Sequence, residues 1–216
     1  MIDPVLHIRE FFTSLQGEGI HSGRPMHFIR TSGCNLQCVY CDTVEHDPAL
    51  ELSVSEILAK FKGNPSLPVY ITGGEPLIQD GVHILAEKLI ENGREVHVDT
   101  NGSRDISVLP VGVHKIIDIK TPGSGAGNSF LKANLKHIAQ SDEIKFVVTS
   151  KDDFLWVVDT IKKWKLPDLT GNITIQPAWG MIDLIELAEL VKSCGLPVRM
   201  GIQLHKVIWG ENAKGV

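Results

Sequence analysis

The sequence predicts an α/β fold in which parallel strands form a partial, splayed barrel. From Pro68 onward, short runs rich in β-branched residues alternate with longer amphipathic runs. This alternation is typical of a parallel sheet with right-handed helical crossovers. We count seven candidate strands in 216 residues, whereas a closed barrel of this type has eight strands and typically about 250 residues. A doubly wound open sheet is the alternative, because one sequence does not reveal strand order.

The candidate strands are short and rich in Val, Ile and aromatic residues. They span residues 26–31, 69–72, 95–99, 115–119, 144–148, 173–176 and 198–203, and we expect the last to be irregular. Helical spacing of apolar residues covers positions 82–89, after a cap at Asp80, and positions 182–191. Ser53 and Glu56 form a capping-box pattern that opens another helix.

Composition favours one globular domain over residues 1–216, with 43% hydrophobic and 22% charged residues. Lys and Arg number 21 against 26 Asp and Glu, so nothing favours a nucleic acid or an anionic membrane as partner. The start at Met1 lacks a signal-peptide pattern, and no run has the apolar length that spans a bilayer. We therefore expect a cytoplasmic protein.

Cys34, Cys38 and Cys41 are the most informative residues of the chain. Clustered thiols do not suit a disulfide framework but do suit metal binding in a reducing compartment. Three thiolates can hold three corners of a cubic iron–sulfur cluster and leave one iron open for a ligand. The alternative is a zinc site that His46 completes, since zinc accepts mixed Cys and His ligands.

Polar residues follow each predicted strand. In a parallel fold these positions meet at one site, because ligands gather at the carboxyl ends of the strands. One such segment is Gly73-Gly74-Glu75-Pro76. Its glycines allow a close backbone approach to a ligand, Glu75 can accept hydrogen bonds from an ammonium group, and Pro76 fixes the exit of the loop.

The Cys-x3-Cys-x2-Cys spacing, with Tyr40 before the last cysteine, resembles the cluster loop of the radical S-adenosylmethionine (SAM) superfamily. The Gly-Gly-Glu-Pro segment resembles the part of that superfamily that receives the SAM amino group. The resemblance implies the partial barrel of the radical SAM type and a [4Fe–4S] cluster that binds SAM at its open iron. It further implies reductive cleavage of SAM to a 5′-deoxyadenosyl radical.

Four further segments resemble the 7-carboxy-7-deazaguanine synthase family, and the likeness extends from Phe11 to Gly210. These segments are residues 14–19, 28–30, 118–125 and 203–210. The resemblance implies Mg²⁺-dependent ring contraction of 6-carboxy-5,6,7,8-tetrahydropterin to 7-carboxy-7-deazaguanine with loss of ammonia, in 7-deazapurine (queuosine) biosynthesis. It also implies a homodimer and an electron donor such as flavodoxin or ferredoxin.

Glu18 and Arg30 are the candidate catalytic residues. A carboxylate such as Glu18 can accept paired hydrogen bonds from a pterin edge, and the planar fork of Arg30 matches a substrate carboxylate. Gln16, Gly17 and Thr72 complete the expected substrate-binding set.

The resemblance also assigns cofactor contacts. Thr43 would carry a hydroxyl to Mg²⁺, which uses few protein ligands and retains water; the alternative is that Thr43 caps a turn. The expected cofactor-binding residues beside the cysteines are Gly73, Gly74, Glu75, Thr100, Lys120, Ser124 and Gln176. Asp99 stands where the family usually has the longer Glu, so the resemblance does not decide which residue near Thr100 contacts the SAM ribose.

Two other functions compete with this one. A radical SAM activase that generates a glycyl radical on a partner protein would share the three-cysteine loop. A metal-binding module without turnover would instead hold zinc and would not cleave SAM.

Overall fold

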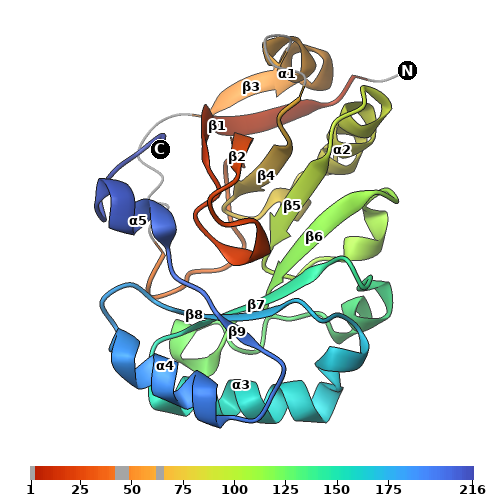
Figure 1. Ribbon diagram of the computed structural model, residues 1–216. Coiled ribbons are helices and arrows are strands. Elements are labelled where there is room, and N and C mark those ends of the chain that lie inside the picture. The colour runs from red at the N-terminus through yellow and green to blue at the C-terminus, as the bar shows by residue number, and fades with distance from the viewer. Residues whose placement is uncertain (1–2, 42–48, 62–65) are drawn as a thin grey trace.

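The computed structural model describes residues 3–41, 49–61 and 66–216, and within them one nine-stranded sheet with five α-helices (Figure 1). The strands are β1 (Val5–Leu15), β2 (Pro25–Thr31), β3 (Leu50–Ser53), β4 (Val69–Gly73), β5 (Val96–Thr100), β6 (Val113–Asp118), β7 (Glu143–Val148), β8 (Ile173–Pro177) and β9 (Arg199–Met200). The helices are α1 (Val54–Lys60), α2 (Val82–Glu91), α3 (Lys151–Trp164), α4 (Leu184–Ser193) and α5 (Leu204–Trp209). Short 3-10 turns are η1 (Gly19–His21), η2 (Pro76–Ile78), η3 (Ile106–Val108), η4 (Pro122–Ser124), η5 (Lys132–His137) and η6 (Leu166–Asp168).

Strand order decides between the two predicted architectures. The sheet has the order β3-β1-β2-β4-β5-β6-β7-β8-β9, and from β2 to β9 all neighbours are parallel. The order never reverses along the parallel strands, as it would in a doubly wound sheet. In Figure 1 the sheet stays open, with β3 at one end and β9 at the other. The predicted partial barrel and its seven parallel strands are confirmed, and β9 is short and irregular as expected.

Two strands were missed at the sequence level. β1 pairs antiparallel with both β2 and β3, and so adds a ribbon to the first parallel strand. Leu6 and Ile8 are fully buried on one face of β1, while His7 between them is exposed. This alternation was a usable strand signal, whereas the four residues of β3 are too few to show a period.

Helix starts were predicted with mixed success. The capping box is present, since Ser53 Oγ accepts a hydrogen bond from Glu56 N and Glu56 Oε2 accepts one from Ser53 N. The expected cap at Asp80 is wrong, because α2 begins after Gly81. α4 begins later than its apolar stripe, after Asp183, whose carboxylate accepts hydrogen bonds from two backbone amides of the first turn.

The two faces of the parallel strands differ in composition. The face toward the helices is apolar and forms two buried clusters, one including α1 and α2 and the other α3 and α4. Because successive side chains of a strand point to opposite faces, the intervening residues line the inside of the partial barrel. There Met26, Phe28, Tyr70 and Ile116 form a small apolar cluster. Beyond it, toward the carboxyl ends of the strands, the inner face becomes charged.

No helix in the described part of the chain is long and apolar enough to cross a bilayer.

Candidate active site

The cysteine loop follows β2 and lies across the carboxyl ends of neighbouring strands. Gly33 O accepts a hydrogen bond from Glu75 N at 2.9 Å, after β4. Asn35 Nδ2 donates to Ser103 Oγ at 2.8 Å, after β5. Val39 N donates to Ser124 O at 3.0 Å, in the turn after β6. Three successive strand ends therefore fix the loop that carries the thiols.

The three thiols suit a cluster site on chemical grounds. None of them forms a disulfide; Cys34 and Cys41 are exposed and Cys38 is half-buried. Burial raises the pKa of Cys34 and of Cys38, and each thiol also interacts electrostatically with Cys41. The loop thus presents three soft ligands at an accessible surface, which is the donor set that an iron–sulfur cluster requires.

The glycine pair after β4 is needed for contact with this loop. A Cβ at Gly74 would lie 2.2 Å from Gly33 O and 2.8 Å from Cys34 Cβ. Gly73 has φ +144°, and a Cβ there would meet the Thr31 carbonyl at 2.2 Å. Any side chain at either position would displace the start of the cysteine loop.

Glu75 is fully buried and connects two loops. Its Oε1 accepts hydrogen bonds from Thr100 Oγ1 at 2.7 Å and Leu77 N at 3.0 Å, and its Oε2 accepts one from Asn101 N at 2.6 Å. Burial raises the pKa of the Glu75 carboxyl despite these hydrogen bonds. Glu75 and Thr100, both expected at the SAM site, therefore contact each other below the cysteine loop.

Lys120 and Ser124 follow β6 and lie beside the Val39–Tyr40 part of the cysteine loop. Lys120 Nζ donates to Asp118 Oδ2 at 2.9 Å and lies 5.5 Å from the centroid of the Tyr40 ring. Ser124 Oγ is buried and donates to Thr121 O at 2.6 Å within its own turn. Ser124 therefore contacts the cysteine loop through its backbone carbonyl, while Lys120 presents its charge beside Tyr40.

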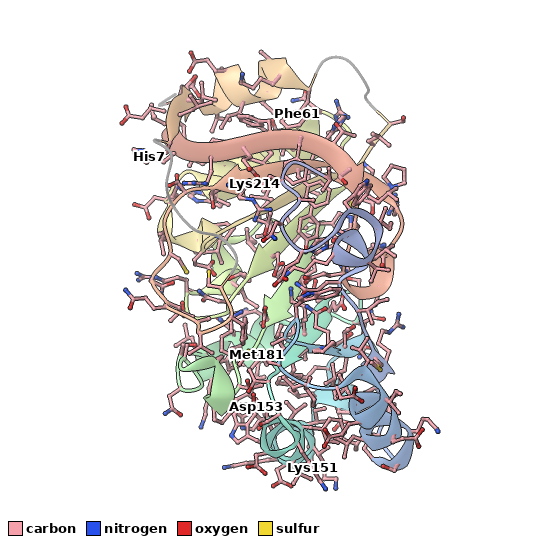
Figure 2. All side chains as sticks on the ribbon, turned by 90° about the vertical axis from the view of Figure 1, so that its left-hand side faces the viewer. His7, Phe61, Lys151, Asp153, Met181 and Lys214 are labelled. Carbon is pink, nitrogen blue, oxygen red and sulfur yellow. The ribbon has the colours of Figure 1, made fainter. Side chains whose placement is uncertain are left out.

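The turn that holds Ser124 is anchored on the start of α3, a helix that the sequence analysis did not identify. Asp153, labelled in Figure 2 near Lys151, accepts hydrogen bonds from Gly123 N at 2.8 Å and Thr121 Oγ1 at 2.9 Å. A Cβ at Gly123 would lie 2.5 Å from the Asp153 carboxylate. This contact fixes the turn that meets the cysteine loop.

A buried lysine lies at the centre of the inner face. Lys145 Nζ is 2.9 Å from Glu18 Oε2, 3.3 Å from Asp99 Oδ2 and 3.6 Å from Asp118 Oδ2. Its side chain is 5% exposed, so water screens these charges poorly. Through Asp118, which also binds Lys120, the network connects Glu18 to the cysteine loop.

Charge pairing, rather than burial, sets the protonation of the central pair. Burial favours neutral Glu18, but the Lys145 charge and hydrogen bonds from Lys145 and Gln203 outweigh it and hold the pKa of Glu18 well below its usual range. Burial likewise lowers the pKa of Lys145, yet Asp99, Glu18 and Asp118 raise it well above its usual range. For Asp99, burial is the larger effect and raises the pKa.

Lys145 is the central residue of the candidate site that the sequence analysis missed. A usable signal was present, because a lysine stands inside the otherwise apolar run Ile144–Val148, and charged residues are almost never fully buried unless paired. Its three acidic partners come from the β1–β2 loop, β5 and β6, so only the folded chain shows why it is there.

Three buried acceptor atoms around this network have no hydrogen-bond partner among the residues that the structure describes. They are Asp118 Oδ1, Gln176 Oε1 and Gln203 Oε1. Gln203 Nε2 donates to Glu18 Oε1 at 2.9 Å, and Gln176 also hydrogen-bonds Glu18. Gln176, expected among the cofactor contacts, therefore lies beside Glu18. Unsatisfied buried acceptors are costly, and they suit a ligand rich in N–H donors.

The predicted substrate residues lie around the same volume. Gln16 is buried, and its Oε1 accepts a hydrogen bond from Glu18 N at 3.1 Å. A Cβ at Gly17 would lie 2.0 Å from His205 Nδ1, and Gly17 O accepts a hydrogen bond from Leu204 N at 2.8 Å. The first residues of α5 therefore pack directly on the loop that carries Glu18.

Arg30 and Thr72 are register partners on β2 and β4. Arg30 Nε lies 3.0 Å from Glu10 Oε2, and the guanidinium carbon lies 5.9 Å from the Phe12 ring centroid. These contacts hold the plane of the guanidinium while its side chain stays 27% exposed. Thr43 and His46 lie outside the described residues.

Comparison with known proteins identifies the family. Residues 28–191 match the model of the radical SAM superfamily. A 7-carboxy-7-deazaguanine synthase of Koribacter versatilis is 35% identical over 98% of this chain and 100% of its own length. A second, from Methanospirillum hungatei, is 41% identical over 94% of this chain and 85% of its own. The chain belongs to the radical SAM superfamily and, within it, to the 7-carboxy-7-deazaguanine synthase family.

Solved structures agree on the fold. The crystal structure of QueE from Escherichia coli superposes with a TM-score of 0.75 and 24% identity, over 93% of this chain and 95% of that one. Streptococcus suis SuiB gives a TM-score of 0.56 at 16% identity and covers 77% of this chain and 46% of SuiB. As a member of the radical SAM superfamily, the chain uses a [4Fe–4S] cluster and SAM. The three exposed or half-buried thiols of Cys34, Cys38 and Cys41 are of the kind that such a cluster requires.

Proposed function

We propose that this protein catalyses the Mg²⁺-dependent ring contraction of 6-carboxy-5,6,7,8-tetrahydropterin to 7-carboxy-7-deazaguanine with loss of ammonia, in 7-deazapurine (queuosine) biosynthesis. The relatives that match over nearly the whole chain carry the name of this synthase. Neither the glycyl-radical activase nor the metal-binding module without turnover has comparable support.

The observation that carries the proposal is the set of buried acceptors around Glu18. The pyrimidine edge of a pterin presents neighbouring N–H donors. The Glu18 carboxylate and the unpaired oxygens of Gln176 and Gln203 offer acceptors in one volume. Lys145 holds Glu18 ionised, and a charged acceptor forms stronger hydrogen bonds than a neutral one.

We assign the substrate carboxylate to Arg30. Its Nε is bound to Glu10, and the terminal nitrogens of the guanidinium fork match a carboxylate in a bidentate pair. Glu18 and Arg30 together would orient the ring so that the carbon bearing the carboxylate faces the cysteine loop. Thr72, the register partner of Arg30, and Gln16 and Gly17 complete this proposed substrate set.

We assign the cofactor contacts to residues in the segments that follow the parallel strands. When bound, the cluster and SAM supply a 5′-deoxyadenosyl radical that abstracts a substrate hydrogen. The three cysteines would hold the cluster, and the backbone of Gly73 and Gly74 would face the SAM amino group. Glu75 and Thr100 brace that segment from below. Lys120 and Ser124 border the loop, and Thr43 would bind Mg²⁺ beside substrate oxygens and water.

Mass spectrometry of the anaerobically reconstituted, reduced protein tests the proposal. The protein is incubated with SAM and 6-carboxy-5,6,7,8-tetrahydropterin, with and without Mg²⁺. We expect many equivalents of 7-carboxy-7-deazaguanine per SAM. Formation of 5′-deoxyadenosine and methionine without this product would retain radical SAM chemistry but overturn the substrate. Thr43→Ala should lose Mg²⁺ stimulation, while the control Thr43→Ser keeps it; equal stimulation in both variants removes Thr43 from the metal site.

We further propose a single domain over residues 1–216, a cytoplasmic homodimer and reduction by flavodoxin or ferredoxin. Exposed apolar side chains on α5, Val207, Ile208 and Trp209, support a second copy as partner. Light scattering coupled to size-exclusion chromatography checks the dimer, which Ile208→Glu should weaken.

A further inference from the structure

Three histidines converge at the end of the barrel opposite the cysteine loop. His21 comes from η1, while His97 and His114 are the second residues of β5 and β6. One ring nitrogen of each lies within 4.8 Å of those of the other two. The ring centroids are 4.7 to 5.0 Å apart. His97 and His114 are register partners on adjacent parallel strands, so their side chains point to the same inner face.

Two of these rings have a buried nitrogen without a protein partner. Neither His97 Nδ1 nor His114 Nε2 has a hydrogen-bond partner among the described residues. His97 is 1% exposed, so water does not readily satisfy Nδ1. An orphaned ring nitrogen in such a place is a costly arrangement unless a ligand binds it.

The contact that the other ring nitrogen of His97 makes leaves Nδ1 available to bind a metal. His97 Nε2 lies 2.8 Å from Glu95 Oε1. The Arg24 guanidinium binds both oxygens of Glu95 at 2.6 Å and keeps it an acceptor. A histidine that donates Nε2–H to a carboxylate has its lone pair on Nδ1, and such carboxylate–histidine pairs are the usual second shell of metal-bound histidine. In that tautomer the lone pair of His97 is on Nδ1, the buried nitrogen that has no partner among the described residues.

We propose that His21, His97 and His114 bind one zinc ion, with Glu95 as the supporting carboxylate of His97. Imidazole nitrogens suit zinc, which takes His ligands in tetrahedral sites. With Zn–N bonds of about 2.0–2.1 Å, the three nitrogens would be roughly 3.4 Å apart, so the rings must close by a small rotation. A water molecule completes the coordination.

The zinc would fix the loop that carries Glu18. His21 lies three residues after Glu18, and Ile20 N between them donates to Glu143 Oε2 at 3.1 Å. A metal that joins His21 to β5 and β6 would hold this loop against the amino ends of the strands. His21 also lines a small cavity together with Glu18 and Lys145. The ion thus has a positioning role for the Glu18 loop and no contact with reacting atoms.

Metal analysis tests the proposal in the holoenzyme. Plasma mass spectrometry of the purified, reconstituted protein should give about one zinc per chain beside the iron. Because the cysteine loop can itself bind zinc, the same measurement is made on the full chain with Cys34, Cys38 and Cys41 changed to Ala. Zinc must remain near one equivalent there, and His97→Asn or His114→Gln in that background must lower it at least tenfold. The exposed His137→Gln is the matched control and keeps its zinc.

Three further measurements keep the proposal testable if a core histidine variant does not fold. His21 lies on the short turn η1 and is half-buried, and His21→Gln should also lose zinc. In the chain without the three loop cysteines, zinc at 100 times its Kd should raise Tm by about 5–10 °C, and His21→Gln should abolish the shift. Cobalt in place of zinc should show tetrahedral visible bands without thiolate charge transfer. Less than a tenth of an equivalent of zinc in the chain without the three loop cysteines, or zinc unchanged there by His21→Gln, would overturn the site.

Discussion

The two faces of β7 show how this protein divides stability from function. Ile144, Phe146 and Val148 point to the helices and are fully buried in one apolar cluster. Glu143 and Lys145 alternate with them, are equally buried, and point into the partial barrel. One six-residue strand thus contributes to an apolar core on one face and to a charged network on the other.

The two faces differ in how much they contribute to the stability of the fold. Apolar burial stabilises by roughly 25 cal/mol per Å² removed from water. A buried ion network gives no comparable gain, because desolvation offsets the attraction between the charges. The outer face therefore stabilises the fold. The charged residues of the inner face could be replaced by apolar residues without loss of stability. Their presence therefore indicates a functional role.

Removal of Lys145 should have the largest effect and act on both properties. Lys145→Met leaves Glu18, Asp99 and Asp118 without their shared cation. We expect the free energy of unfolding to fall by about 3–5 kcal/mol and turnover to fall at least about 100-fold. Anaerobic denaturant titration and product formation measure the two effects.

Lys115→Met is the matched control on the neighbouring strand. Lys115 Nζ lies 2.9 Å from Asp142 Oδ2, a buried pair away from the inner face. This variant should lose stability to a similar degree yet keep turnover within about twofold of the parent. Lys145→Arg retains the charge and should recover the fold. Parental turnover in Lys145→Met would contradict the role of the network.

A substitution that creates a large cavity on the outer face of β7 should lower stability and leave activity unchanged. Phe146 is fully buried beneath α3, with its ring 6.5 Å from that of Trp156. Phe146→Ala should lower the free energy of unfolding by about 3–5 kcal/mol, with kcat of the folded protein unchanged. Leu155→Ala, at a position 49% exposed on α3, serves as control and should cost less than about 1 kcal/mol. A fall in kcat comparable to that of Lys145→Met would remove the distinction between the faces.

Glu18→Gln should act more on activity than on stability. Asp99 and Asp118 still pair with Lys145, so we expect the free energy of unfolding to fall by less than in Lys145→Met, although the Glu18–Lys145 pair is lost. Product formation should drop about 100-fold, while the cluster absorption stays intact. Isothermal titration with substrate checks the assigned contact, and unchanged affinity would count against it. Glu91→Gln on α2 is the control.

The smallest effect is expected at a helix cap far from either face of β7. Ser53→Ala removes the side chain that accepts from Glu56 N at the start of α1. The free energy of unfolding should fall by about 1 kcal/mol, with no change in turnover. Ser55→Ala, two residues later in the first turn of α1 and without a capping role, should be nearly neutral. A turnover defect in Ser53→Ala would show that α1 is coupled to the site.

Local chemistry explains which parts of this protein were predictable. The cysteine spacing, the glycine pair and the Ser53–Glu56 box involve residues within a few positions of one another, and their function follows from reach along the chain. The seven parallel strands were predictable for the same reason, since β-branched runs and helical periodicity are local patterns. β3 was not predictable, because four residues carry no period.

Tertiary structure decided the rest. The sequence by itself determined the alternation of strands and helices and carried the motifs by which the chain resembles the radical SAM superfamily, because these patterns are short-range. Only the folded chain brought Lys145 against Glu18, 127 positions away, and gathered His21, His97 and His114 at one point. Those contacts depend on strand order and register, and on which face each residue takes, and these are settled by packing between segments that are distant in the sequence.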